Sequence, residues 1–418
     1  MIQKPRGTID ILPEEMPYFY KIEDTARRIS ALHGFAELRF PTFEATELFA
    51  RGVGGTTDVV QKEMYTFTDR ENRSYTLRPE GTACVARAVI ENGRCSDAMP
   101  LRLYYLINCF RYEKPQAGRS REFYQFGTEL FGADSPAADA ELIALANDVI
   151  TGVGITGAKL HINSIGCPEC RPGYHERLRE FFSQNEEKLC PTCRERLKTN
   201  PLRILDCKNE DCKILCEGAP KMMDNLCSGC ADHFARLREL LGVMGLEYTV
   251  DTSIVRGLDY YTRTVFEFIS DKIGAQSTIC GGGRYDGLIK ELGGPALSGI
   301  GFAMGITRLI LAMKACEAKV AEPEKPRLYI APMGAAAGAA AMRLTAQLRE
   351  SGIYAECDIV GRSLKAQMKY ADKKNAAFTL IIGDSELETG NAILKNMTTG
   401  EQTEVGVRDI DTLRRLLG

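Results

Sequence analysis

The cysteines of this chain are crowded into one segment. Of the 15 cysteines among 418 residues, nine fall between Cys167 and Cys230. The charged N-terminus has no apolar stretch of the kind found in secretory signals, so we expect the protein to reside in the reducing cytoplasm. Clustered cysteines in that compartment are metal ligands more often than disulfides. The cluster therefore predicts a small metal-dependent unit within a larger fold.

The spacing inside the cluster is typical of zinc sites. Two CxxC pairs are separated by nineteen residues, which fits a two-knuckle zinc site. We predict one structural zinc ion at this site, bound by Cys167, Cys170, Cys190 and Cys193. A second site is expected among the remaining cysteines, with Cys216 as the spare, at Cys207, Cys212, Cys227 and Cys230. Reduced, partly buried cysteines with incidental spacing are the alternative.

A charged linker between prolines divides the chain, whose length already exceeds what one hydrophobic core usually organises. After the linker, strand and helix patterns alternate in the order βαβαβ, which predicts a small, mainly parallel sheet covered by helices. We expect a catalytic body of residues 1–166 and 241–314, a mostly helical insertion over 167–240, a linker over 315–326 and a C-terminal module over 327–418.

Several segments of the catalytic body have strand character. Residues 101–112 and 121–131 are rich in aromatic and β-prone residues, and the polar stretch between them predicts an antiparallel pair joined by a basic loop. Residues 37–43 predict a short strand in which Pro41 favours a sheet edge or a bend. Helical spacing over residues 14–34 predicts a helix that precedes these strands.

A run of glycines lies in the second half of the catalytic body. Residues 264–270 predict a strand, and residues 297–313 predict a glycine-rich strand that leads into a helix. Between them, glycines 281–283 predict a tight turn with exposed amide groups. That turn is expected to present Arg284, Tyr285 and Asp286.

One predicted strand carries groups suited to a polar ligand. Because side chains alternate along a strand, Gln125 and Glu129 share a face with Gly127, which leaves room for a ligand against the sheet. Arg111 ends the neighbouring strand and can reach the same face. An amide, an acid and a guanidinium together suit a zwitterion or a phosphate. A solvated face with ordinary salt bridges is the alternative.

Two further segments place arginine beside suitable partners. Arg256 offers a fixed fork of donors, and Tyr260 and Tyr261 offer flat walls tipped with hydroxyls. Arg308 follows a glycine-rich stretch near the start of an apolar helix, where anions bind favourably. Neither segment matches the phosphate-loop or dinucleotide fingerprint, which disfavours the two common nucleotide-binding folds.

The charge balance limits how the chain can bind nucleic acid. A net charge of −3, from 53 basic and 56 acidic residues, excludes a wholly basic, sequence-blind binder. No apolar run has the length of a membrane span. RNA contacts must therefore come from local patches, although lysine stripes are usually solvated faces. The candidates are a loop with Lys114, Gln116, Arg119 and Arg121, and a helical stripe of Arg362, Lys365, Lys369 and Lys373.

The order of these segments resembles the class II aminoacyl-tRNA synthetases and, within them, the bacterial histidyl-tRNA synthetases. RGLDYYTRTVFE at 256–267 and GGGRYDGL at 281–288 are similar to two signatures of that family. FRYEKPQAGRSREFYQFGTELFG at 110–132 resembles class II motif 2, and GIGFAMGITRLI at 299–310 resembles motif 3. The resemblance covers nearly the whole chain. It implies an α+β catalytic domain with an antiparallel class II sheet, a cysteine-rich helical insertion and a C-terminal α/β anticodon-binding domain.

The resemblance also implies an activity and its partners. Such a ligase activates L-histidine with ATP and Mg²⁺ to histidyl-adenylate and pyrophosphate, and then transfers histidine to the 3′ end of tRNA(His). A homodimer is implied through the strand around Pro41, which is similar to class II motif 1. Contacts with the tRNA are implied at Gln116 and Arg119 of the motif 2 loop, and at Arg362, Lys365 and Lys369 of the C-terminal module.

Residue roles follow from the same resemblance. Arg111 is expected on the α-phosphate, Arg308 on the γ-phosphate, and Arg256 on the reacting carboxylate and the α-phosphate. Glu80, Thr82 and Gln125 are expected at the α-amino group of histidine. Glu129, Tyr261 and Tyr285 are expected at the imidazole ring. With the adjoining Gly81 and Tyr260, the implied histidine-binding set is Glu80, Gly81, Thr82, Gln125, Glu129, Tyr260, Tyr261 and Tyr285.

Two other functions fit the sequence less well. A synthetase-like regulator of ATP phosphoribosyltransferase shares the catalytic fold, but it typically lacks the C-terminal module and has degraded arginine motifs. Here residues 327–418 are present, and so are Arg111, Arg256 and Arg308. A synthetase for another amino acid does not account for RGLDYY and GGGRYDG together.

Overall fold

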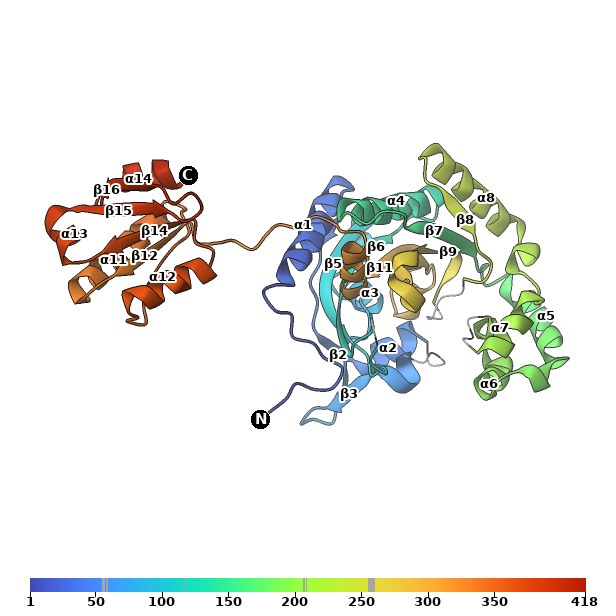
Figure 1. Ribbon diagram of the computed structural model, residues 1–418. Helices are drawn as coiled ribbons and strands as arrows, with labels where there is room; N and C mark the ends of the chain where they lie inside the picture. Colours follow the sequence, from blue (N-terminus) through green and yellow to red (C-terminus); the bar gives the residue numbers. More distant parts are fainter. Residues whose placement is uncertain (55–56, 58, 117, 206, 208, 255–259) are drawn as a thin grey trace. The chain divides into compact units, whose positions relative to one another are not determined.

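The computed structural model describes residues 1–54, 57, 59–116, 118–205, 207, 209–254 and 260–418. The chain divides into two compact units, Met1–Ala321 and Glu322–Gly418. Figure 1 draws the elements of both units along the chain. No helix among the described residues has the length and apolar character needed to cross a lipid bilayer.

An eight-stranded sheet organises the first unit. Its order is β1-β5-β6-β11-β10-β9-β7-β8. The six inner strands pair antiparallel, while β1 and β8 add parallel strands at the edges. The strands are β1 Ala36–Glu37, β5 Leu101–Phe110, β6 Glu122–Phe131, β7 Lys159–Ser164, β8 Tyr248–Val250, β9 Thr262–Ile269, β10 Thr278–Arg284 and β11 Gly299–Gly305. The predicted antiparallel pair of residues 101–112 and 121–131 is confirmed as β5 and β6.

Helices cover both faces of this sheet because side chains of neighbouring strand residues point to opposite sides. Tyr104 joins the core packed against helices α1 Met16–Leu32, α4 Pro136–Gly152, α8 Ser228–Val243 and α10 Ile306–Ala315. Tyr105 joins the core of the other face, beneath α3 Thr82–Glu91 and α9 Leu288–Glu291. The predicted helix of residues 14–34 is confirmed as α1.

The segment around Pro41 differs from the prediction. Residues 37–43 do not form one strand, because Pro41 separates β1 from β2 Phe43–Ala45. Strand β2 belongs to a second, three-stranded sheet, with β4 Ser74–Leu77 in its centre and β3 Tyr65–Thr68 at its edge. The proline thus marks a bend between two sheets. Helix α2, Thr46–Gly52, follows β2.

The glycine run was predicted wrongly as a turn. Gly281, Gly282 and Gly283 lie inside β10 and pair with β9 and β11. A Cβ added to Gly282 would lie 2.3 Å from the carbonyl oxygen of Gly301, so the close approach of strands requires glycine here. Arg284 is consequently buried at the end of a central strand.

The insertion is helical, as predicted, and carries its own small core. Its helices are α5 Arg171–Ser183, α6 Pro191–Thr199 and α7 Glu210–Glu217, with short 3₁₀ turns between them, and α8 leads back to the sheet. Cys170, Cys193, Cys212 and Cys230 are themselves buried in this core, among a few apolar side chains.

The second unit is a five-stranded sheet in the order β13-β12-β14-β15-β16. The predicted βαβαβ segment is confirmed, but the sheet is mixed because a C-terminal hairpin, β15 and β16, pairs antiparallel with β14. The hairpin strands were not predicted. The elements are β12 Leu328–Pro332, α11 Ala335–Glu350, β13 Ala355–Cys357, α12 Leu364–Lys373, β14 Phe378–Ile382, α13 Asp384–Thr389, β15 Asn391–Asn396, β16 Gln402–Gly406 and α14 Ile410–Leu417.

A buried charge network ties α4 and α8 to the sheet. Asp139 of α4 accepts a hydrogen bond from Arg284 Nε at 2.6 Å and lies 2.8 Å from Nε2 of His233 on α8. Arg284 also bonds Asp286 and the carbonyl oxygens of Ala133 and Ser135. The side chains of Asp139 and Arg284 are fully buried, so each depends on the other for charge compensation.

Replacing Asp139 with alanine should therefore destabilise the first unit strongly. Removing one partner of a buried ion pair costs about 3 kcal/mol or more. The control is Asp148→Ala on the same helix, whose carboxylate is about half exposed and pairs with His33 at 3.1 Å. This exposed pair should contribute less than about 1 kcal/mol. Urea unfolding followed by circular dichroism measures both losses, and equal losses would contradict the assigned role of Asp139.

Candidate active site

A cavity of about 460 Å³ lies over the middle strands of the first unit. Residues of β5, β6, β10 and β11, the start of α3 and the start of α10 line it. Most of the predicted site residues meet here, namely Glu80, Gly81, Thr82, Arg111, Gln125, Tyr260, Tyr261 and Arg308. Arg256 lies outside the described residues.

Glu129 lies directly beneath one end of the cavity rather than on its wall. Its carboxylate accepts hydrogen bonds from the hydroxyls of Thr82 at 2.7 Å and Tyr105 at 3.2 Å, and also from the hydroxyl of Tyr285. These donors come from α3, from β5 and from the residue that follows β10. Three separate elements thus converge on one fully buried acid.

Burial controls the protonation of this acid. Desolvation raises the pKa of Glu129 to about 8, against the opposing effect of the hydroxyls of Tyr285 and Thr82. The neutral carboxyl therefore predominates at pH 7. A polar ligand that supplies a positive charge or another donor at this end would restore the carboxylate.

Aromatic side chains form one wall beside Glu129. The rings of Tyr260 and Tyr261 lie 4.7 Å apart between centroids, and Tyr285 meets Tyr260 edge to face at 5.5 Å. All three side chains are buried. The rings are inclined to one another by 53° and 71°, so they offer a planar heteroaromatic ligand both edge and face contacts with hydroxyl groups nearby.

Glu80 completes the polar end of the cavity. Its two carboxylate oxygens accept hydrogen bonds from the backbone amides of Thr82 and Ala83 at 2.7 and 2.9 Å. These amides begin α3, where a carboxylate is stabilised by the helix dipole. Burial nevertheless raises the pKa of Glu80. Gln125 lies nearby and accepts from the thiol of Cys109 at 3.3 Å.

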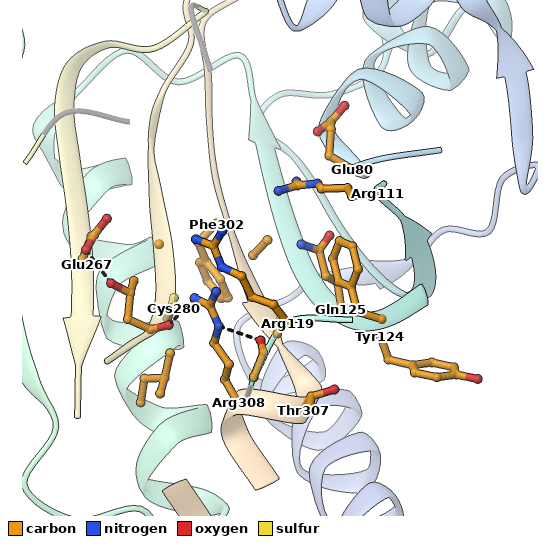
Figure 2. A pocket seen from close by; sticks show the side chains of 18 of the residues that line it. Glu80, Arg111, Arg119, Tyr124, Gln125, Glu267, Cys280, Phe302, Thr307 and Arg308 are labelled. Atoms are coloured by element: carbon orange, nitrogen blue, oxygen red, sulfur yellow. Dashed lines mark hydrogen bonds between the residues drawn. The ribbon is translucent and has the colours of Figure 1, made fainter. Parts of the chain in front are cut away.

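Three arginines also line the cavity: Figure 2 shows Arg119 and Arg308 close together and Arg111 beside Glu80. Arg111 donates to the carbonyl oxygen of Pro79 at 2.8 Å. Arg308 donates to Gly118 and Thr278 carbonyl oxygens at 3.2 and 2.9 Å. Desolvation first, and then the nearby charge of Arg119, lowers the pKa of Arg308. Crowded, partly desolvated cations of this kind favour a polyanion.

Two residues have roles that the sequence did not indicate. Tyr105 fills the space above Gly127, where an added Cβ would lie 2.3 Å from its ring, so the expected ligand space at Gly127 is occupied by protein. The register pairs Tyr105 with Gly127, and alternation along β5 was the available signal. Arg119, expected at the tRNA, lines the cavity beside Arg308 and pairs with Glu113 at 2.8 Å.

Gln116 is not among the residues that line this cavity, and Arg362, Lys365 and Lys369 belong to the second unit. Gln116 forms an isolated bridge with Arg119 at the turn between β5 and β6. In the second unit, Lys365 and Lys369 are exposed on α12. Arg362 pairs with Asp358 at 2.6 Å and stacks over Tyr370.

The cysteines pair differently from the prediction. One group that could hold a metal joins Cys167 and Cys170 with Cys227 and Cys230, and the other joins Cys190 and Cys193 with Cys207 and Cys212. The predicted grouping of the first two CxxC pairs is therefore wrong. Helix α5 lies between the first two pairs along the chain, and the last pair, at the start of α8, lies close to the first.

An antiparallel sheet whose cavity is lined by three arginines and closed below by a buried carboxylate is the catalytic architecture of a class II aminoacyl-tRNA synthetase. The family model described as histidyl-tRNA synthetase matches residues 7–170 and 176–309, and the model described as anticodon binding domain matches residues 327–413. The chain belongs to the histidyl-tRNA synthetase family.

Individual relatives agree over the full length. A histidine–tRNA ligase of Acetivibrio thermocellus is 51% identical over 99% of this chain and 98% of its own. One of Halothermothrix orenii is 50% identical, with full coverage of both chains. The crystal structure of apo histidyl-tRNA synthetase from S. aureus matches with a TM-score of 0.83 and 39% identity, over 99% of each chain.

The raised pKa of Glu129 predicts a pH-dependent stability that Glu129→Gln removes. The ordinary value is 4.5, whereas folded Glu129 keeps its proton up to about pH 8. Between these values the unfolded state binds fewer protons, so the free energy of unfolding of the wild type should fall as pH rises and level off above about pH 8. Relative to the glutamine variant, the fall should correspond to about one proton. Urea unfolding at pH 5, 6.5 and 8.5 tests this, and parallel curves for the two proteins would contradict it.

Proposed function

We propose that the protein activates L-histidine with ATP to histidyl-adenylate and pyrophosphate, and then esterifies histidine to the 3′ end of tRNA(His). The lining of the cavity carries the proposal: the buried acid Glu129 with its neighbouring tyrosines suits an imidazole, and three arginines suit a triphosphate. The near 50% identity to histidine–tRNA ligases over the whole chain supports it.

The arginines of the cavity account for the first chemical step, formation of histidyl-adenylate. The histidine carboxylate attacks the α-phosphate and pyrophosphate leaves, so two anions must approach each other. Arg111 and Arg308 offset that repulsion, and Arg256 is proposed to join them. Mg²⁺ supplies further positive charge on the phosphates when bound. Glu113 and Glu267 line the same cavity and are the carboxylates that would hold it.

The carboxylate end accounts for specificity. We propose that Glu129, Tyr261 and Tyr285 bind the imidazole and that Glu80, Thr82 and Gln125 bind the α-amino group, with Gly81 and Tyr260 in the same wall. An apolar isostere would leave Glu129 and its hydroxyl donors without a ligand partner, which is the stronger form of discrimination.

The other partners complete the proposal. The tRNA is proposed to contact Gln116 and Arg119 at its acceptor end, and Arg362, Lys365 and Lys369 through the anticodon-binding unit. We propose four parts, with a catalytic domain of residues 1–166 and 241–314, an insertion of 167–240, a linker of 315–326 and an anticodon-binding domain of 327–418. We also propose a homodimer that works in the cytoplasm, and zinc in the insertion.

The direct test of the function is ATP–pyrophosphate exchange with each of the twenty amino acids, followed by charging of total tRNA. Exchange with histidine alone and charging of one tRNA are expected. Folded protein that binds histidine but supports no exchange would reject the synthetase and point to a regulatory protein.

Glu129→Gln should raise the KM for histidine more than the KM for ATP. The amide keeps the size of the side chain but cannot provide a carboxylate for the imidazole, which should cost roughly tenfold or more in histidine KM. Glu122→Gln is the control, because Glu122 lies on the same strand, outside the cavity, and bonds Asn108. Equal changes in both Michaelis constants would remove Glu129 from the histidine pocket.

A further inference from the structure

Cysteines make up four of the twelve buried residues that the structure describes in the core of the insertion. Its helices are short, and cysteines occupy several of its buried positions. Units of this size usually need a metal or disulfides in addition to their core. All fifteen cysteines are free thiols, so disulfides do not fill that need.

The first cysteine group lies at the base of the insertion, where the chain leaves and re-enters the catalytic unit. Cys167 Sγ lies 3.7 Å from Cys170 Sγ and 3.8 Å from Cys227 Sγ. A tetrahedral zinc ion with Zn–S bonds of about 2.3 Å separates its sulfurs by about 3.8 Å, whereas a disulfide requires about 2.05 Å. The backbone amide of Cys227 also donates to Cys170 Sγ at 3.1 Å.

The second group lies at the tip, between α6 and α7. Cys190 Sγ is 3.8 Å from Cys207 Sγ, and the backbone amide of Cys190 donates to Cys212 Sγ at 3.3 Å. Cys193 completes the group. In both groups all four sulfurs lie within 4.8 Å of one another. Amide donors to sulfur stabilise thiolates, as metal-bound cysteines require.

Residues that flank the first CxxC pair of the base group are hydrogen-bonded to the chain around Tyr261, which belongs to the proposed histidine pocket. Arg171 follows Cys170 directly, and its guanidinium donates to the backbone carbonyl oxygen of Tyr261. The backbone of Gly166, adjacent to Cys167, accepts from Arg263 N at 2.9 Å. The residues that flank this CxxC pair are thus bonded to the segment that carries the tyrosine wall.

The second CxxC pair reaches the pocket by another route. Cys227 and Cys230 begin α8, and His233 lies one turn further on. His233 bonds Asp139, which holds Arg284. The next residue, Tyr285, donates to Glu129. A tetrahedral ion bound by both CxxC pairs at the base would hold the starting points of these two hydrogen-bonded connections in place.

We propose that the insertion binds two zinc ions, one at each cysteine group, and that the base ion positions the wall of the histidine pocket while the tip ion only holds the tip together. Four thiolates in tetrahedral arrangement select zinc among the common divalent ions. The positioning role rests on the proposed function; the two zinc sites do not.

Zinc counts in double variants test the sites and their pairing. Full-length wild type should carry two zinc ions per chain by mass spectrometry. Cys167→Ser with Cys227→Ser should leave one, and Cys190→Ser with Cys207→Ser should also leave one. The crossed variant, Cys167→Ser with Cys190→Ser, should leave none. Wild type with less than one zinc, iron in its place, or a crossed variant that retains one zinc would overturn the assignment.

The Michaelis constants of the same variants test the positioning role. In ATP–pyrophosphate exchange, the variant of the base group, Cys167→Ser with Cys227→Ser, should raise the KM for histidine roughly three- to tenfold, the range expected for loss of one or two hydrogen bonds. The KM for ATP should change little. The tip variant should leave both constants unchanged. Equal effects of the base and tip variants would overturn the role. Absence of exchange in the wild type would reject the proposed function but leave the zinc counts valid.

A variant that keeps both zinc ions distinguishes the proposed positioning role from local unfolding of the insertion after metal loss. Arg171→Ala removes the bond to Tyr261 without removing a ligand, so it should retain two zinc ions and still raise the KM for histidine roughly threefold or more. Arg177→Ala, an exposed arginine on the same helix, should change neither quantity. An unchanged histidine KM in Arg171→Ala would contradict the proposed route from the base ion to the pocket.

Discussion

A carboxylate buried in the middle of an antiparallel sheet is the constraint on which the rest of the catalytic unit depends. Glu129 has no access to solvent, and an acid in such a place is costly unless hydroxyls or a ligand satisfy it. Thr82, Tyr105 and Tyr285 converge on it from three elements. Gly301 on the adjacent strand leaves the space, because a Cβ there would lie 1.9 Å from the carboxylate. Burying this acid is unfavourable for folding, which is consistent with a role for Glu129 in ligand binding.

Arginine side chains are the second main feature of the cavity. Arg111, Arg119 and Arg308 line it, and desolvation followed by the nearby charge of Arg119 lowers the pKa of Arg308. The cavity therefore brings acids and arginines together: Arg111 lies beside Glu80, and Glu113 and Glu267 line the cavity with Arg119 and Arg308. We propose that the amino acid places its ring near Glu129 and its carboxylate toward the arginines that hold the phosphates of a nucleoside triphosphate.

Sequence patterns predicted elements well where one period dominated. The alternation in residues 101–112 and 121–131 and the helical spacing before Gly34 gave the right elements because both periods reflect burial on one face. The glycine run at 281–283 was predicted wrongly because glycine marks turns and close strand contacts alike, and only the neighbouring strands decide between them. Arg284 was misplaced with it, since its partner Asp139 lies 145 residues away in sequence. The cysteine pairing failed for the same reason: proximity along the chain does not give the tertiary path that returns Cys227 to Cys167.

We propose that the part of the cavity above Glu129 recognises the ring nitrogens of histidine. Titration calorimetry with L-histidine and with β-(2-thienyl)-L-alanine, a five-membered-ring isostere without ring nitrogens, tests it most directly. The isostere should bind at least about a hundredfold more weakly to the wild type, because it offers no ring nitrogen to the buried polar groups at Glu129. Comparable affinities for the two amino acids would contradict the claim, since the pocket would then select by shape alone.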